Sequence, residues 1–129
     1  MIVVDSGAIA EVLLAQGRAD AILAVLLSNT ELHVPAHFHV EVLSALRRYS
    51  LRGMLNDLDT AEALAVLADL RTLAYPIREL MPAIWQLRFN LTTYDAAYLA
   101  LARWLDADLL TLDAGLAEAA ARDGRLVNV

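Results

Sequence analysis

The sequence predicts an α/β fold of three layers, in which a central parallel sheet is flanked by helices on both faces. Short apolar segments rich in β-branched residues alternate with segments whose apolar residues recur at helical spacing, from one end of the chain to the other. Strands joined by helical crossovers are typical of a parallel sheet. The chain has 129 residues and no internal repeat or linker, so we expect residues 1–129 to form a single domain.

The expected elements follow from this alternation and from the turn residues between them. The strands are predicted at 2–4 (IVV), 31–35 (ELHVP), within 74–80 (AYPIREL), 109–112 (LLTL) and 125–129 (RLVNV). The helices are predicted at 8–16, 18–28, 36–50, 59–73, 80–89, 92–105 and 113–122. Asp59, with Glu62 three residues later, is expected to cap the fourth of these helices.

The composition excludes several classes of function. The chain has no cysteine, which excludes thiol catalysis, disulfides and thiolate zinc sites, and its ten basic residues are all arginine, which excludes a Walker A lysine. No apolar run approaches the roughly 20 residues of a membrane-spanning helix, and the start lacks a signal-like basic region, so we expect a cytoplasmic protein without membrane contact. The net charge of −6 argues against broad electrostatic binding of nucleic acid, but bound metal would neutralise part of it.

Four carboxylates lie where a strand gives way to a helix or where a helix begins. They are Asp5, Glu41, Asp95 and Asp113. Ligands of open α/β sheets bind outside the carboxyl ends of the strands, so acids delivered there from four elements can converge. Oxygen-only clusters suit hard divalent cations such as Mg²⁺ or Mn²⁺. We therefore interpret the four acids as the ligands of a catalytic metal ion.

Each acid also has a plainer explanation. Asp5, Asp95 and Asp113 could each serve as part of a helix cap, where a negative charge is favourable anyway. Glu41 is harder to explain in this way, because no basic residue follows it at the i+4 position. Asp108 precedes the predicted strand that Asp113 follows, so we place it at the opposite edge of the sheet, away from the site.

Two hydroxyl residues are secondary candidates for the site. Ser6 adjoins Asp5, and Thr111 interrupts an otherwise apolar strand two residues before Asp113. Side chains two residues apart on a strand point to the same side, so Thr111 could orient a carboxylate. An ordinary β-branched strand residue explains Thr111 equally well.

The histidines and two arginines give weaker signals. His37 and His39 would diverge by roughly 200° on a helix, so we do not expect a histidine-based metal site. Arg48 and Arg52 are like charges one helical turn apart, which is unfavourable unless an anion lies nearby. A substrate phosphate or an acidic residue would serve as that anion.

The motifs that carry the four acids resemble the PIN-domain ribonucleases, in particular the VapC-type toxins of bacterial type II toxin–antitoxin systems. The resemblance covers essentially the whole chain, through IVVDS, PAHFHVEVLSALRR, TTYDAAYLALA and LLTLDAGLA. It implies that the four acids are the metal ligands. Two positions depart from the family pattern. Gly7 stands where the family often has a hydroxyl or amide residue, and Leu116 offers no further acid after the fourth motif, which bears on a second metal ion.

The resemblance implies a Mg²⁺- or Mn²⁺-dependent endoribonuclease toxin that hydrolyses phosphodiester bonds in cellular RNA, such as tRNA or rRNA loops, and so inhibits translation. It also implies a homodimer and a cognate VapB-type antitoxin that blocks the site. Arg48 and Arg52 are our candidates for contacts with the RNA backbone. Two alternatives stay open: a catalytically weak PIN-like module that acts through protein binding, and a metal-dependent phosphatase or DNA-directed nuclease on a similar scaffold.

Overall fold

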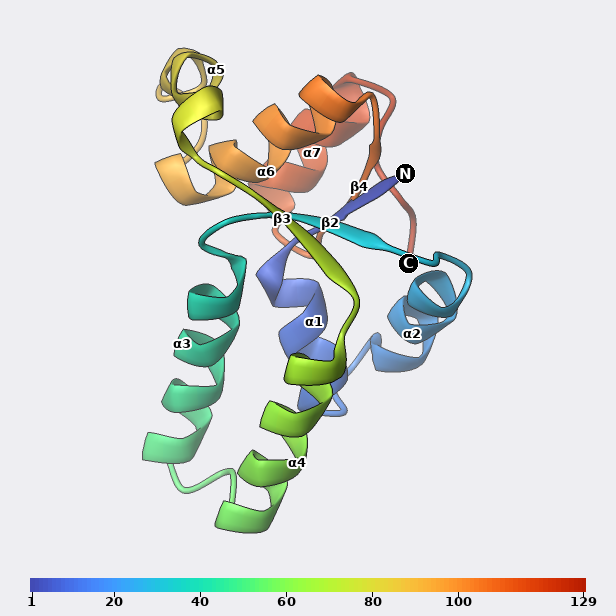
Figure 1. Cartoon of the computed structure of the whole chain (residues 1–129), viewed down its shortest axis with the longest axis vertical. Helices are drawn as coiled ribbons and strands as arrows, with labels where there is room; N and C mark the ends of the chain where they lie inside the picture. The colour runs from blue at the N-terminus through green and yellow to red at the C-terminus, as the bar shows by residue number, and fades with distance from the viewer.

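A computed structural model describes residues 1–129 and places a four-stranded sheet between two layers of helices (Figure 1). The strands are β1 (Ile2–Val4), β2 (Leu32–Pro35), β3 (Thr72–Tyr75) and β4 (Asp108–Leu110). The helices are α1 (Ser6–Leu13), α2 (Ala19–Leu27), α3 (Phe38–Leu51), α4 (Asp57–Asp69), the 3₁₀ turn η1 (Arg78–Leu80), α5 (Met81–Gln86), α6 (Thr93–Leu105) and α7 (Ala114–Arg122). The predicted three-layer fold with a parallel sheet is confirmed.

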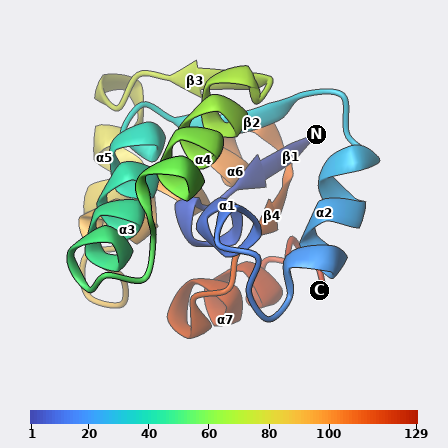
Figure 2. The same cartoon turned by 90° about the horizontal axis from the view of Figure 1, so that it is seen from below.

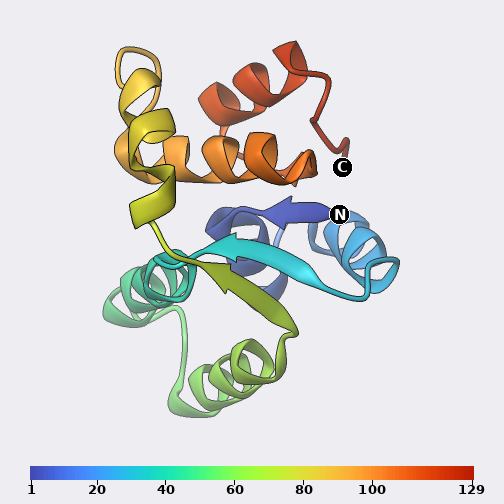
Figure 3. The same cartoon turned by 45° about the horizontal axis from the view of Figure 1, so that its top comes forward.

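The sheet has the strand order β3-β2-β1-β4, and all of its strand pairs are parallel. The chain first winds from β1 to β3 through α1 to α4, which cover one face of the sheet. It then returns through α5 and α6 on the opposite face and adds β4 on the other side of β1 (Figure 3). The winding therefore reverses between β1 and β4, and a crevice at the carboxyl ends of these two strands is the favoured place for a ligand.

The helix α6 lies deepest in the molecule and contacts β1, β2 and β4. Its residues from Ala96 to Ala102 are all buried, and four of these seven are alanines, whose small side chains let the helix approach the sheet closely. This burial on all sides explains why the middle of α6, from Ala96 to Ala102, is almost entirely apolar and shows no single stripe. On the opposite face α1 lies centrally, between α2 and the pair α3 and α4 (Figure 2).

The helix α4 starts and ends earlier than the sequence predicts. Its N-cap is Asn56, whose side-chain oxygen accepts a hydrogen bond from the backbone N–H of Asp59 at 2.7 Å. The prediction of Asp59 as the cap is therefore wrong, because asparagine is as good a cap as aspartate and stands one turn earlier. The helix ends at Asp69, since the next residues leave it to pair as β3 with β2, and this pairing overrides their helical pattern.

Three further predictions differ from the structure in extent. The strand predicted at 125–129 is reduced to one bridge, in which Leu126 pairs with Leu109 beside β4. The strand predicted at 109–112 lies one to two residues earlier, and the helix predicted at 80–89 is a 3₁₀ turn followed by the short α5. None of the helices combines the length and the apolar character that crossing a membrane requires.

Candidate active site

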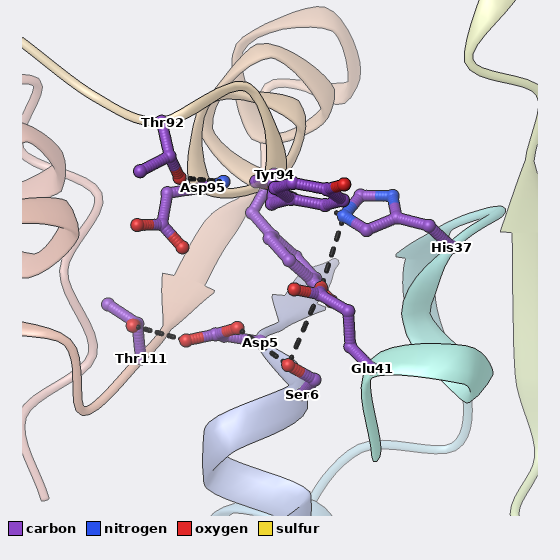
Figure 4. A network of polar contacts seen from close by, with 9 residues as sticks. Asp5, Ser6, His37, Glu41, Thr92, Tyr94, Asp95 and Thr111 are labelled. Atoms are coloured by element: carbon purple, nitrogen blue, oxygen red, sulfur yellow. Dashed lines mark hydrogen bonds and ion pairs between the residues drawn. The ribbon is translucent and has the colours of Figure 1, made fainter. Parts of the chain in front are cut away.

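Asp5 lies where β1 ends, in the crevice between β1 and β4. Its backbone N–H extends the strand ladder to the carbonyl oxygen of Leu110 at 2.9 Å, and the residue is only 6% exposed. Asp5 occupies the N-cap position of α1, yet its carboxylate accepts no capping hydrogen bond. It accepts hydrogen bonds instead from Thr111 Oγ1 at 2.8 Å and, more weakly, from Ser6 Oγ at 3.3 Å (Figure 4). The capping explanation therefore does not account for this acid.

Thr111 connects the carboxyl ends of β1 and β4. Its hydroxyl donates to Asp5 Oδ2 and accepts a hydrogen bond from the backbone N–H of Asp113 at 3.1 Å. The side chain is buried. A hydroxyl that both donates and accepts here explains why a polar residue interrupts the apolar strand segment, and it supports the orienting role that the sequence suggested.

Glu41 lies in the first turn of α3 and is held through one of its two carboxylate oxygens. Oε1 accepts hydrogen bonds from the Tyr98 hydroxyl at 2.7 Å and from His37 Nε2 at 3.1 Å, and Ser6 Oγ lies at 3.5 Å. His37 Nε2 also lies 3.2 Å from the carbonyl oxygen of Tyr94. Both of these neighbours are acceptors, so Nε2 must carry the proton. The second oxygen, Oε2, takes part in none of these bonds.

Asp95 and Asp113 come from the first turn of α6 and from the N-cap of α7. The cap of α6 is Thr92, whose hydroxyl accepts the N–H of Asp95 at 3.2 Å, so the Asp95 carboxylate is not required for capping. Figure 4 shows this carboxylate directed into the space beside Asp5. Asp113 does cap its helix, because Oδ1 accepts the N–H of Leu116 at 2.8 Å. Its other oxygen accepts no hydrogen bond within the chain.

The four acids are close enough that the charge of one affects the pKa of another. Burial raises the pKa of Asp5 to about 6, a shift that the Thr111 hydrogen bond opposes and the charges of Asp95 and Glu41 increase. Burial, followed by the charges of Asp113 and Glu41, also raises the pKa of Asp95. No three His, Cys, Asp or Glu side chains are drawn together as a metal-binding group.

Glu41 responds in the opposite sense. Its partial burial favours the neutral acid, but the hydrogen bonds from His37 and Tyr98 outweigh burial and lower its pKa. Burial and the bond to Glu41 raise the pKa of the Tyr98 hydroxyl, which therefore remains a donor at neutral pH. The surroundings thus favour the ionised form of Glu41 and disfavour the ionised forms of Asp5 and Asp95.

Tyr98 and His37 are the residues that the sequence analysis missed. Tyr98 is fully buried, and as the one polar side chain in the segment from 96 to 102 it could have been noticed. His37 stands four residues before Glu41, a spacing that brings two side chains together on a helix. The other histidines bind elsewhere, His33 to the Tyr75 hydroxyl and His39 to Thr72, so the expectation that the histidines share no ion agrees with their positions.

The remaining candidates divide into near and distant ones. Arg48 lines a polar cavity of about 420 Å³ together with Ser6 and Glu41, whereas Arg52 lies one turn further along α3 and does not line it. A side chain at position 7 would begin 3.6 Å from Asp5 Oδ2, so Gly7 leaves the surroundings of that oxygen open. Leu116 is fully buried in the core, so no acid extends the set of four at that position.

Comparisons with known proteins agree with this fold. The family model for the PIN domain matches residues 2–122. Ribonuclease VapC9 of Mycobacterium tuberculosis is 39% identical over 118 residues, which are 92% of this chain and 90% of that protein. Ribonuclease VapC12 of the same species is 35% identical over 118 residues, or 92% and 91% of the two chains.

A solved structure resembles this chain in fold at a lower sequence identity. The crystal structure of Mycobacterium tuberculosis VapC20, described as a sarcin–ricin loop cleaving toxin, superposes with a TM-score of 0.70 at 16% identity and covers 92% of this chain and 95% of that one. The sheet, the crevice and the acids thus define a PIN domain. The chain belongs to the PIN-domain family, and its relatives place it among the VapC-type members of that family.

Replacing Asp5 with asparagine is expected to stabilise the metal-free protein above pH 6. The pKa of Asp5 is about 6 in the folded state against 3.8 for an unperturbed group, so above pH 6 the buried charge costs about 3 kcal/mol, which Asp5→Asn removes. The advantage shrinks as the pH falls toward 3.8, because the folded wild-type carboxyl is then already protonated. Urea unfolding in EDTA at pH 8 and pH 4.5 measures both values.

Asp108→Asn is the matched control for this experiment. Asp108 pairs with Ile2 at the start of β4, at the opposite edge of the sheet, and is exposed, so its replacement should change the free energy of unfolding by less than about 0.5 kcal/mol. A lower free energy of unfolding for Asp5→Asn than for the wild type at pH 8 would contradict the conclusion that the ionised Asp5 carboxylate destabilises the fold.

Proposed function

We propose that this protein is a metal-dependent endoribonuclease that acts as the toxin of a toxin–antitoxin pair and cleaves loop regions of tRNA or rRNA. The observation that carries the proposal is that four carboxylates from four elements lie near enough for their charges to interact, with Asp5 buried among them. The ribonuclease names of VapC9 and VapC12, and the description of VapC20 as a toxin that cleaves the sarcin–ricin loop, support the same reaction.

The donor set suits a hard divalent cation. Asp5, Glu41, Asp95 and Asp113 would hold Mg²⁺ or Mn²⁺, because they offer only oxygen and Glu41, Asp95 and Asp113 keep oxygens that are free of hydrogen bonds. When bound, the ion supplies an activated water and neutralises charge at phosphorus in an in-line displacement. Burial and the neighbouring carboxylates raise the pKa of Asp5 and of Asp95, and a cation bound among these acids would offset their repulsion.

The neighbouring residues keep these carboxylates in position. Thr111 fixes Asp5 through Oδ2, and Tyr98 fixes Glu41 through Oε1, with His37 as a second donor to the same oxygen. These hydrogen bonds restrict the rotation of both carboxylates before substrate arrives, which lowers the entropy lost in the reaction. Hydrolysis by water would leave a 5′-phosphate and a 3′-hydroxyl.

The RNA backbone has to approach a protein surface on which the four carboxylates carry negative charge. Arg48 is the basic side chain in the cavity beside Glu41, and we propose that it contacts an RNA phosphate. Arg52, one turn further along α3, would contact the backbone further from the cut. These contacts add affinity where the four acids alone would repel a phosphodiester.

Incubation of the purified protein with total RNA tests the proposal. In the presence of Mg²⁺ or Mn²⁺ we expect discrete cuts with 5′-phosphate ends, which sequencing of the new 5′ ends would locate. EDTA should abolish them, and Asp5→Asn should reduce the rate by at least 100-fold, because the group at the floor of the site is lost. Asp108→Asn should cut like the wild type.

The same experiment separates the rival activities. Parallel incubations with single-stranded DNA and with a phosphate monoester decide between a ribonuclease, a DNA nuclease and a phosphatase. Absence of cleavage with every RNA, by a protein that still binds Mn²⁺, would leave the catalytically weak PIN-like module that acts through protein binding as the better account.

We also propose a homodimer and a VapB-type antitoxin as partners. Two apolar cavities lie side by side between α1, α2 and α4, and they share Val12, Leu13 and Val66 in their walls. Leu23 and Leu27 are exposed beside them on α2. An antitoxin segment with apolar side chains would cover this surface, which is larger than a free monomer would leave exposed without a function.

Val66→Glu tests the antitoxin surface. Val66 is 52% exposed, so the charge should not disturb the core, yet it would be buried by a bound antitoxin. We expect at least tenfold weaker binding of the antitoxin by calorimetry, with RNA cleavage unchanged. Leu51→Glu, an exposed position at the end of α3, is the control and should bind normally. Equal antitoxin affinity of Val66→Glu and wild type would place the antitoxin elsewhere.

A further inference from the structure

An apolar cavity of about 420 Å³ opens beside the acids, between the η1–α5 segment and the start of α6. Its walls include Ile77, Met81, Trp85, Tyr94 and His37. The volume lies within the range of roughly 300–1,000 Å³ that is usual for sites of small ligands. None of the functions described above uses this cavity.

Two side chains join the cavity to the acids. His37 lines the cavity and donates from Nε2 to Glu41 Oε1 at 3.1 Å. Tyr94 lines the same cavity and also the polar cavity that contains Ser6, Glu41 and Arg48. Figure 4 shows Tyr94 and His37 side by side next to Glu41. A ligand that extends from the apolar cavity into the polar one therefore passes the carboxylates.

The mouth of the cavity offers flat aromatic surfaces next to a positive charge. Trp85 and Tyr94 are each 62% exposed, although large aromatic side chains usually lie buried. The Arg88 guanidinium stacks on Trp85 at 4.8 Å and on Phe89 at 4.3 Å from the ring centroids. An aromatic face with an adjacent guanidinium is the combination that binds an unpaired base and its phosphate.

Because the protein is negatively charged, a nucleic acid would gain affinity from a stacking contact that does not depend on charge. The net charge is −6, and four of the acidic groups surround the point where the cut would occur. Phosphate contacts alone therefore give little attraction near the acids. Base stacking does not depend on net charge and can supply the missing affinity.

We propose that this cavity binds one unpaired base of the RNA substrate, next to the phosphodiester that is cut. The proposal rests on the proposed ribonuclease function and adds the element that selects the cleavage position. The base stacks on Trp85 at the mouth, while the phosphates on either side lie toward Arg88 and toward Arg48. An RNA whose bases are all paired cannot fill the cavity, so the site favours single-stranded or loop RNA.

The test uses a short single-stranded RNA that contains the mapped cut, together with versions in which one nucleotide beside the cut is abasic. Trp85→Ala should lower kcat/KM on the intact RNA roughly 5- to 140-fold, the range expected from stacking one base on an aromatic side chain. One abasic position should cause a similar loss in the wild type and no further loss in Trp85→Ala. Trp85→Phe, which keeps an aromatic face, should recover most of the rate.

Trp104→Ala is the matched control. Trp104 is 55% exposed near the other end of α6, against Tyr75, and does not line the cavity. This variant should cleave like the wild type and show the full abasic effect. Equal rates of Trp85→Ala and wild type, or losses that multiply when the two changes are combined, would overturn the base site while leaving the ribonuclease intact.

Two other outcomes would overturn it in different ways. If sedimentation shows that Trp85→Ala dissociates a dimer and the rate falls equally on every RNA, the cavity is a contact with a second copy of the chain. If the wild type cleaves no RNA under any metal condition, the proposed function itself fails, and the base site fails with it.

Discussion

The buried carboxylate of Asp5 is the constraint on which the rest of the site depends. β1 is the central strand next to the point where the winding reverses, so the residue after it is enclosed by helices from both layers. A charge in this position loses most of its hydration, and one hydrogen bond from Thr111 does not restore it. The fold thus carries an unfavourable buried charge, as proteins do where activity requires it.

The other three acids are placed by helix starts, and this placement moderates their repulsion. α1, α3, α6 and α7 all begin at the carboxyl edge of the sheet, so the positive ends of their dipoles face the acids. Glu41 is further stabilised by Tyr98 and His37, whereas Asp113 keeps one oxygen free of hydrogen bonds within the chain. Glu41 is thus held in place, whereas the carboxylates of Asp95 and Asp113 can turn. Together with the buried Asp5, they form a set that could bind a cation.

The sequence indicates these four acids because each stands at a boundary between a strand and a helix or at the start of a helix, which local patterns identify. The same reasoning places Asp108, which begins a strand, at the opposite edge of the sheet from the four acids. Tyr98 could not be assigned to Glu41, because the two are 57 residues apart and meet only when the folded sheet brings α3 and α6 together at its carboxyl edge. The reduced strand at Leu126 differs from prediction for a similar reason, since tertiary pairing decides where such elements end.

The central claim is that the crevice around Asp5 is built for a divalent cation, and diffraction from crystals grown with Mn²⁺ tests it most directly. We expect an anomalous peak about 2.0–2.5 Å from a carboxylate oxygen of Asp5, with further ligands from Glu41, Asp95 or Asp113, and no peak in Asp5→Asn. A Mn²⁺ peak elsewhere on the protein, or none at saturating Mn²⁺, would contradict the account.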